Sequence, residues 1–157
     1  MNPMPIEDRI VVDGVGVVLG EIGLLLRGPS GSGRSDLALR LIDAGARLIA
    51  DEQVEIARRG SWVTLGALAS LPPSLKGRIE ARGLGLVPVP YVAEAQLLGW
   101  VVDLVAAEAV ERMPKAQSVD YLGIKVPLLC LYPFHPSVTA KLRLVVRCGP
   151  DLIMGRE

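Results

Sequence analysis

Short apolar stretches separated by glycine, proline and charged residues run along the whole chain. Residues 10–19 (IVVDGVGVVL) and 22–27 (IGLLLR) are rich in Val, Leu and Ile, and they predict two short strands. Residues 36–45 (DLALRLIDAG) place apolar side chains at helical spacing, with an acid in the first turn and a glycine positioned to cap the carboxyl end. They predict an α-helix, and residues 47–50 (RLIA) predict a further strand.

The middle of the chain is less uniform. The segments QVEIARR and SWVTLGA, on either side of Gly60, predict a hairpin, and the Pro- and Gly-punctuated residues 71–78 predict a loop. Residues 92–113 combine helix-favouring Ala, Glu and Leu with the apolar run LLGWVVDLV. Their periodicity leaves a helix and a buried strand both open.

The last third predicts one more strand and one more helix. Residues 124–132 (IKVPLLCLY) favour a strand, and Pro136 is placed to open a helix that Gly149-Pro150 stops. Strands interleaved with helices indicate an α/β fold. A length of 157 residues is that of one domain, so residues 1–157 are expected to form a single unit.

Charge argues against a nucleic-acid partner. The chain has 17 Lys and Arg and 17 Asp and Glu, and the basic residues are scattered. A nucleic-acid-binding domain usually carries a basic excess, because phosphate contacts supply much of its affinity. Cys130 and Cys148 fit no metal-ligand spacing and are expected to be idle thiols.

Hydropathy does not make this a membrane protein. The mean hydropathy of +0.41 is high. A spanning helix needs about 20 mostly apolar residues, and Glu21 breaks one of the longest apolar stretches while Asp103 and Glu108 break another. The first residues, MNPMPIEDR, lack the basic and apolar regions of a signal peptide. A cytoplasmic protein is therefore expected.

The strongest chemical signal is a glycine-rich loop between a predicted strand and a predicted helix. It has the spacing G-x-x-x-x-G-[K]-[S/T] of a phosphate-binding loop, and it consists of Gly28, Pro29, Ser30, Gly31, Ser32, Gly33, Arg34 and Ser35. Glycines let backbone N–H groups turn inward around an anion, and the start of the helix adds positive charge. The alternative is an ordinary Gly/Ser turn. Arg34 stands where Lys is usual, and the two are not interchangeable, which leaves phosphate transfer open.

Two further motifs accompany this loop. Residues 35–56 (SDLALRLIDAGARLIADEQVEI) and 79–87 (IEARGLGLV) resemble segments of the catalytic domain of bacterial HPr kinase/phosphorylase. The second is the more diagnostic, because it resembles the family signature L-E-I-R-G-L-G. The matching positions of that signature are Glu80, Arg82, Gly83 and Gly85. The resemblance runs from about Asp13 to the C-terminus.

The resemblance implies a fold and an activity. It implies a P-loop domain of the phosphoenolpyruvate-carboxykinase-like type and a family tendency to form hexamers. It also implies phosphorylation of a serine on the phosphocarrier protein HPr with ATP and Mg²⁺, and the reverse use of phosphate to release pyrophosphate. The N-terminal domain of the long family members is absent from this sequence, which resembles the short form found in some proteobacteria.

The resemblance also implies roles for single residues. Ser35 and Glu80 match Mg²⁺-binding positions, and a carboxylate suits Mg²⁺ because this ion prefers hard oxygen ligands. Asp51-Glu52 matches the acidic pair Asp-Asp, whose second member is the general base. Glu52 is one methylene longer, so Asp51 is a second candidate for the base and a further candidate metal ligand. Arg82 is expected either to contact phosphate or to brace the loop of Glu80.

Three positions depart from the family pattern. Asp13 stands where the family has the histidine of an H-G pair, Arg34 replaces Lys, and Glu52 replaces Asp. The basic segment P-V-x-x-G-R is replaced by VPLLCLYPFHPS, so an arginine contact is lost. Three hypotheses follow. The first is an active kinase/phosphorylase. The second is a regulatory module that has lost catalysis, senses nucleotide or phosphate and acts through a protein partner. The third is a purely structural domain.

The remaining chemistry-bearing side chains favour structural roles. His135, the one histidine of the sequence, precedes a predicted helix and is expected to be a loop or cap residue. Trp62 and Trp100 are expected to pack in the core or in the hairpin. Three acids are expected to be solvated or to end strands: Glu94, Asp103 and Glu108.

Overall fold

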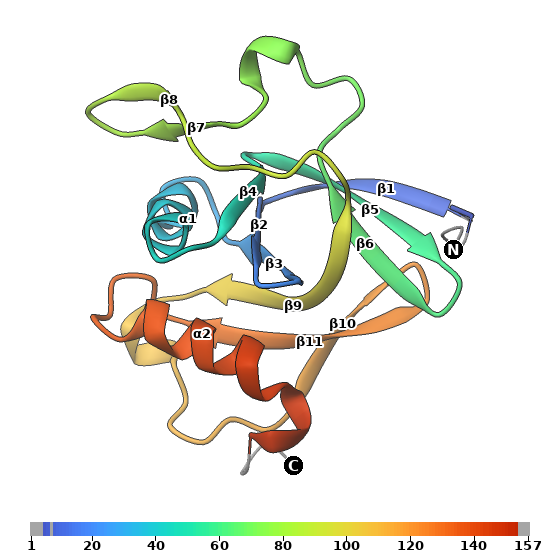
Figure 1. The fold of residues 1–157 in the computed structure, drawn as a ribbon. Helices are drawn as coiled ribbons and strands as arrows, with labels where there is room; N and C mark the ends of the chain where they lie inside the picture. The colour runs from blue at the N-terminus through green and yellow to red at the C-terminus, as the bar shows by residue number, and fades with distance from the viewer. Residues whose placement is uncertain (1–4, 7, 154–157) are drawn as a thin grey trace.

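A computed structural model describes residues 5, 6 and 8–153 and shows a mixed α/β fold (Figure 1). The first seven strands of this part are β1 (Asp8–Asp13), β2 (Val15–Leu19), β3 (Ile22–Arg27), β4 (Arg47–Ala50), β5 (Gln53–Arg59), β6 (Trp62–Gly66) and β7 (Arg78–Ala81). The others are β8 (Gly85–Pro88), β9 (Gln96–Leu104), β10 (Gln117–Tyr121) and β11 (Ile124–Leu131). The α-helices are α1 (Arg34–Asp43) and α2 (Val138–Cys148), and short 3-10 turns cover Pro73–Leu75, Ala107–Ala109 and Pro150–Leu152.

Four strands of the large sheet run in the same direction. β9 is parallel to β3 and to β11, while β2 is antiparallel to both β3 and β4, so β4 runs with β3. The carboxyl ends of β4, β3, β9 and β11 therefore meet at one edge of the sheet. Ligands of open α/β sheets bind at such an edge, in the loops that leave the strands.

The core lies on both faces of β3. Leu24 and Leu26 face a cluster that also holds Leu37 of α1 and Leu142 of α2, whereas Leu25 faces the opposite cluster. All of these side chains are fully buried. Alternate residues of a strand point to opposite faces, so a continuous apolar run such as Leu24–Leu26 is what a doubly covered strand requires.

The prediction of one strand over residues 10–19 was wrong, because the chain divides at Gly14. β1 leaves the division to pair with β5, and β2 pairs with β3 and β4. Gly14 has φ +154°, and a Cβ there would lie 2.7 Å from Leu25 Cδ1. The close approach to β3 leaves room for no side chain at this position.

Most other predicted elements are confirmed. The strands 22–27 and 47–50, the first helix, the hairpin around Gly60 and the strand after Ile124 are all present. Residues 92–113, for which a helix and a strand were both left open, contain a strand, β9. This strand lies between β3 and β11 and buries Trp100. The final helix begins at Val138, two residues after Pro136, and ends before Gly149, where φ is +75°.

One strand was missed: β10 was not predicted, because its sequence QSVDY is short and largely polar. The two tryptophans take the two places expected for them, since Trp100 is buried in the core and Trp62 lies in the β5–β6 hairpin, where it is 43% exposed. No helix in the described part of the chain is long and apolar enough to span a membrane.

Candidate functional site

The glycine-rich loop connects the carboxyl end of β3 to the start of α1. Gly31 (φ +84°) and Gly33 (φ +97°) occupy the left-handed region that favours glycine. The N–H of Ser32 donates to the carbonyl of Pro29 at 3.0 Å and closes the turn. A Cβ at Gly28 would lie 2.5 Å from Ser32 Oγ, so the tight fold of the loop requires glycine there.

The loop leaves one hydroxyl without a partner. Ser32 Oγ is buried and makes no hydrogen bond to any described residue. A buried polar group left in this way costs about 1–3 kcal/mol. An oxyanion held by the loop would supply the missing partner, and the positive end of α1 lies beside it. Both features suit a phosphate group.

Three candidate metal-binding residues come together next to this loop. Ser35 Oγ donates to Asp51 Oδ1 at 2.9 Å, and the backbone N–H of Glu80 donates to Asp51 Oδ2 at 3.1 Å. Asp51 follows β4, and Glu80 lies on β7 of the β7–β8 hairpin. Asp51 therefore links the loop to the hairpin through both of its carboxylate oxygens.

The donor set fits Mg²⁺ in one particular way. In the described residues no group of three or more His, Cys, Asp and Glu is arranged to hold a metal ion. Mg²⁺ does not need such a group, because it usually keeps several waters and takes one or two carboxylates together with substrate phosphates. Ser35, Asp51 and Glu80 offer oxygens of the required kind beside the candidate phosphate site.

The second acid of the pair has an unusual backbone. Glu52 has φ +71°, and Leu122 (φ +56°) is the other non-glycine residue with a positive φ in the described part. The carbonyl of Glu52 accepts the N–H of Gly14 at 2.9 Å. Asp13 lies next to the pair as well, since its Oδ1 accepts from Gln53 Nε2 at 3.3 Å. Backbone strain of this type is concentrated at functional sites.

A pocket of about 380 Å³ opens over the loop. It is lined by Ser30, Gly31, Gly33, Arg34, Ser35, Asp36, Glu52, Glu80, Arg82 and Phe134. The structure thus brings together the predicted residues of the loop, the acidic pair and the IEARGLG motif. Asp51 lies beneath the pocket wall through its bond to Ser35, and Gly28, Pro29 and Ser32 shape the loop without lining the pocket.

Phe134 is the pocket residue that sequence reasoning missed. It belongs to the connection between β11 and α2, where the resemblance implied the replacement of a basic P-V-x-x-G-R segment. The replacement of that segment was the available signal, but it indicated only the loss of an arginine. No local pattern showed that an aromatic ring would face the loop.

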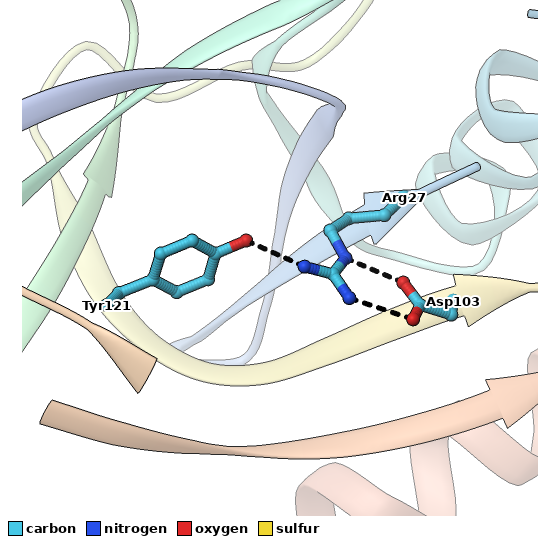
Figure 2. A network of polar contacts seen from close by, with 3 residues as sticks. All are labelled: Arg27, Asp103 and Tyr121. Carbon is cyan, nitrogen blue, oxygen red and sulfur yellow. Dashed lines mark hydrogen bonds and ion pairs between the residues drawn. The ribbon is translucent and has the colours of Figure 1, made fainter. Parts of the chain in front are cut away.

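A second polar cluster lies beside the loop and has a different character. Arg27, the last residue of β3, donates from Nε and Nη2 to the two oxygens of Asp103 at 2.6 and 2.8 Å. Its Nη1 donates to Tyr121 Oη at 3.1 Å, as Figure 2 shows. Of the two roles expected for Asp103, a solvated charge or a strand-end charge, the structure shows the second, because Asp103 lies near the end of β9 and both of its oxygens are held by Arg27. This bond to Asp103 is the main cause that raises the pKa of Arg27 above its ordinary value.

His135 is a loop residue that precedes α2, one of the two places expected for it. Its Nδ1 lies 2.8 Å from Ser137 Oγ and accepts the backbone N–H of Ser137 at 3.2 Å. These contacts lie at the start of α2 and outside the pocket over the loop. His135 is therefore a structural residue of the β11–α2 connection.

The fold and the site define a class: a mixed α/β domain with a glycine-rich loop and neighbouring carboxylates at one sheet edge. The family model described as the HPr Serine kinase C-terminal domain matches residues 6–136. The chain belongs to this family. The match begins before Asp13 and ends at residue 136, whereas the motifs suggested a start near Asp13 and an end at the C-terminus.

Individual relatives agree with this membership. HPr kinase/phosphorylase of Chloroherpeton thalassium is 34% identical over 126 residues, which are 74% of this chain and 36% of the relative. The protein of the same name from Burkholderia lata is 35% identical over 127 residues, or 75% of this chain and 38% of the relative. The matched region is thus little more than a third of the length of these relatives.

A solved structure has the same fold. The HPr(Ser) kinase/phosphatase from Coxiella burnetii superposes with a TM-score of 0.73 at 24% sequence identity. The superposition covers 88% of each chain. It confirms the mixed α/β architecture that the sequence predicted.

Proposed function

We propose that the protein is a protein-serine kinase and phosphorylase that uses ATP and Mg²⁺ and acts on an HPr-type phosphocarrier protein. In this proposal residues 28–35 are a P-loop, and the domain is of the phosphoenolpyruvate-carboxykinase-like type. The observation that carries it is the 2.9 Å hydrogen bond from Ser35 Oγ to Asp51 Oδ1. It joins the serine of the loop to the acid that follows the next strand, as in proteins whose P-loop serine and strand-end aspartate share one Mg²⁺.

The metal role falls to Ser35, Asp51 and Glu80. When bound, Mg²⁺ neutralises charge on the phosphate oxygens as transfer proceeds. Asp51 holds the Ser35 hydroxyl and the Glu80 backbone N–H by hydrogen bonds, and the side-chain oxygens of these three residues would hold the ion. Arg34 and Arg82 line the same pocket and are suited to contact phosphate oxygens.

The proton role falls to Glu52. Glu52 is exposed, lines the pocket and follows Asp51, with φ +71°. It removes the proton of the incoming serine hydroxyl, while the phosphoryl group leaves ADP for the serine oxygen. In the reverse reaction the serine oxygen regains that proton from Glu52, and inorganic phosphate takes the phosphoryl group to give pyrophosphate. Asp51 is the second candidate for this base.

A transfer assay tests the proposal. Purified protein, Mg²⁺-ATP and an HPr-type protein are incubated, and phosphoserine on the acceptor is measured by mass spectrometry. We expect transfer that is lost when Ser35 is changed to Ala. The reverse arm adds inorganic phosphate to the phosphorylated acceptor and measures pyrophosphate. Absence of phosphoserine at high enzyme and Mg²⁺-ATP concentration would contradict the proposal.

A second candidate function is a module that senses nucleotide or phosphate and regulates a protein partner. It is favoured by the pocket wall, where Phe134 rather than a basic side chain is contributed by the β11–α2 connection, and by Arg34 in the place of Lys. This candidate predicts ligand binding without turnover, and partial recovery of turnover in the double variant Arg34→Lys, Glu52→Asp. Native turnover of about 1–100 s⁻¹, an ordinary kinase rate, would exclude it.

The proposal extends to assembly and location. Residues 1–157 form one catalytic domain that acts in the cytoplasm as a homo-oligomer, a hexamer by family resemblance. Light scattering coupled to size-exclusion chromatography measures the mass of the assembly. A monomeric mass at micromolar concentration would contradict this part of the proposal alone.

A further inference from the structure

Phe134 lies against the loop that is proposed to bind phosphate. A Cβ on Gly33 would lie 2.8 Å from Phe134 Cζ, so the tip of the ring covers the last glycine of the loop. The residue is nevertheless 53% exposed, and it lines the pocket. An aromatic ring that keeps this much surface in water next to a polar site is available for contact with a ligand.

Neighbouring groups fix the orientation of this ring. Tyr132 packs against it edge to face, with the centroids 5.7 Å apart and an interplanar angle of 75°. The guanidinium of Arg40 lies 6.0 Å from the ring centroid, and it also bonds the Asp36 carboxylate and the Pro133 carbonyl. The ring is thus positioned before a ligand arrives, which lowers the entropy that binding costs.

Phe134 and the candidate metal site approach the loop from opposite sides. In the sheet the strand order is β4, β2, β3, β9, β11. Asp51 follows β4 and Phe134 follows β11, so they lie on opposite sides of β3 and its loop. In Figure 1 the β7–β8 hairpin, which holds Glu80, lies above α1, and the β11–α2 connection lies below it. A triphosphate whose terminal end lies at Ser35 and Asp51 would therefore direct its nucleoside toward Phe134.

We infer that Phe134 is the surface on which the base of a bound nucleoside triphosphate stacks. The inference rests on the proposed function, since it requires that residues 28–35 hold the phosphates. A flat base would cover the exposed face of the ring, whereas a polyphosphate without a nucleoside offers nothing to stack. Phe134 thereby selects nucleotide over bare polyphosphate.

Calorimetric titration with two probes tests this inference. ATP and inorganic tripolyphosphate, each with Mg²⁺, are titrated into the wild type and into Phe134→Ala. Loss of a stacking ring weakens base binding on the order of 10-fold. We expect the Kd for ATP to rise by about that factor, while the Kd for tripolyphosphate stays within about 2-fold. Phe134→Tyr, which keeps the ring, should bind ATP like the wild type.

Two controls isolate the ring. Phe134→Leu keeps apolar bulk without a flat aromatic face and should weaken ATP like Phe134→Ala. Trp62→Ala removes another exposed aromatic side chain, on the β5–β6 hairpin outside the pocket, and should leave both affinities unchanged. Thermal unfolding of each variant checks that the fold is retained.

The outcomes separate the inference from the proposed function. Selective weakening of ATP supports the inference. An unchanged Kd for ATP in Phe134→Ala, or equal weakening of both probes, overturns it and leaves the phosphate site standing. Equal affinity of the wild type for the two probes also overturns it. Failure of the wild type to bind either probe overturns the proposed function together with the inference.

Discussion

Two aspartates at the same edge of the sheet have opposite surroundings. Asp103, near the end of β9, gives both carboxylate oxygens to one guanidinium, and its side chain is 27% exposed. Asp51, after β4, accepts from two neutral donors, Ser35 Oγ and the Glu80 N–H.

Under the proposed function, this difference separates a structural carboxylate, Asp103, from a metal-binding one, Asp51. The charge of Asp103 is balanced within the protein, so the Arg27–Asp103–Tyr121 network can hold strands together but offers no charge to a ligand (Figure 2). The Asp51 carboxylate is oriented by two neutral donors. Under the proposed function it would take up a cation brought in with the phosphates, as a catalytic metal ligand does. Four predictions test this contrast.

The largest effect is expected from Asp51→Asn. Asn keeps the shape and can still accept the Ser35 hydroxyl, but it removes the negative charge and the acceptor of the exposed Glu80 N–H, which water can replace. Loss of a partner that supports a metal costs about 10- to 100-fold, and a direct ligand at least as much. We expect phosphate transfer to HPr to fall on the order of 100-fold or more, with the midpoint of urea unfolding almost unchanged.

The matched control for this variant is Asp43→Asn. Asp43 ends α1 and is exposed outside the pocket, so its change should leave both transfer and stability near wild type. Equal loss of activity in the two variants would contradict a specific role of Asp51. A large loss of stability in Asp51→Asn would show that Asp51 belongs with Asp103 as a structural group.

The next effect is on stability, from Arg27→Met. The change leaves the half-buried Asp103 carboxylate without its guanidinium, and an interaction of this kind contributes between an exposed ion pair and a buried charged hydrogen bond. We expect the free energy of unfolding to fall by about 1–2 kcal/mol in urea titrations followed by tryptophan fluorescence. Arg143→Met, an exposed arginine of α2, should change it by less than about 0.5 kcal/mol.

A double-mutant cycle with Asp103→Asn sharpens this result. The two single changes should be non-additive by about 0.5 kcal/mol or more, since the partners are in direct contact. Additive effects would mean that the network seen in Figure 2 does not contribute to folding. Asp103 could then no longer be described as a structural carboxylate in contrast to Asp51.

The local elements of this fold and site could be predicted from the sequence. Contacts between strands that are far apart in the sequence could not. The loop and α1 lie in one contiguous stretch, so spacing alone located them. Ser35, Asp51 and Glu80 were brought together by motifs that resemble a family. Asp103 was expected as a possible strand-end charge, but its ion pair was not predicted, because its partner Arg27 is 76 positions away on a neighbouring strand.

Two further misses have the same cause. The break at Gly14 depends on how closely Leu25 approaches from β3, which no period in residues 10–19 reveals. Phe134 faces the pocket because β11 delivers the following residues to the edge where β3 ends. Such placement is a property of the sheet order, and sequence patterns report the sheet order only weakly.

A third prediction concerns Glu52, where one substitution should change the free energy of unfolding and the transfer activity in opposite directions. A non-glycine residue at φ +71° is strained, and Gly adopts this conformation without a steric penalty. We expect Glu52→Gly to raise the free energy of unfolding by about 0.5–1 kcal/mol while transfer to HPr falls. Urea titration and the phosphoserine assay measure the two effects.

The other positive-φ residue provides the comparison. Leu122 (φ +56°) lies in the β10–β11 turn outside the pocket, so Leu122→Gly relieves backbone strain without touching the site. Its transfer activity should equal that of the wild type. A Glu52→Gly variant that is fully active would remove Glu52 as the base and leave Asp51 as the candidate.

The smallest expected effect is on the reactivity of Cys130, which pairs with Asp103 in the β9–β11 register. It reports on the charges of the Arg27–Asp103–Tyr121 network. Burial raises the pKa of the Cys130 thiol, Asp103 raises it further, and Arg27 lowers it. The raised pKa favours the protonated thiol in the folded state, so this contribution to stability is present below the ordinary thiol pKa and is lost as the pH rises through the folded value. At pH 8 the thiolate fraction is smaller than in an unfolded chain.

Alkylation by iodoacetamide in a Cys148→Ser background measures that fraction. Because the thiolate is the reacting species, Cys130 should react more slowly at pH 8 than a cysteine in a short peptide. Asp103→Asn removes the anion and leaves the Arg27 cation, so it should accelerate the reaction, whereas Glu94→Gln, a change of an exposed acid, should not. An unchanged rate in Asp103→Asn would mean that the Asp103 charge is already fully neutralised by Arg27. The charges of the Arg27–Asp103–Tyr121 network would then cancel completely, and Asp103 would differ from Asp51 even more than the hydrogen bonds indicate.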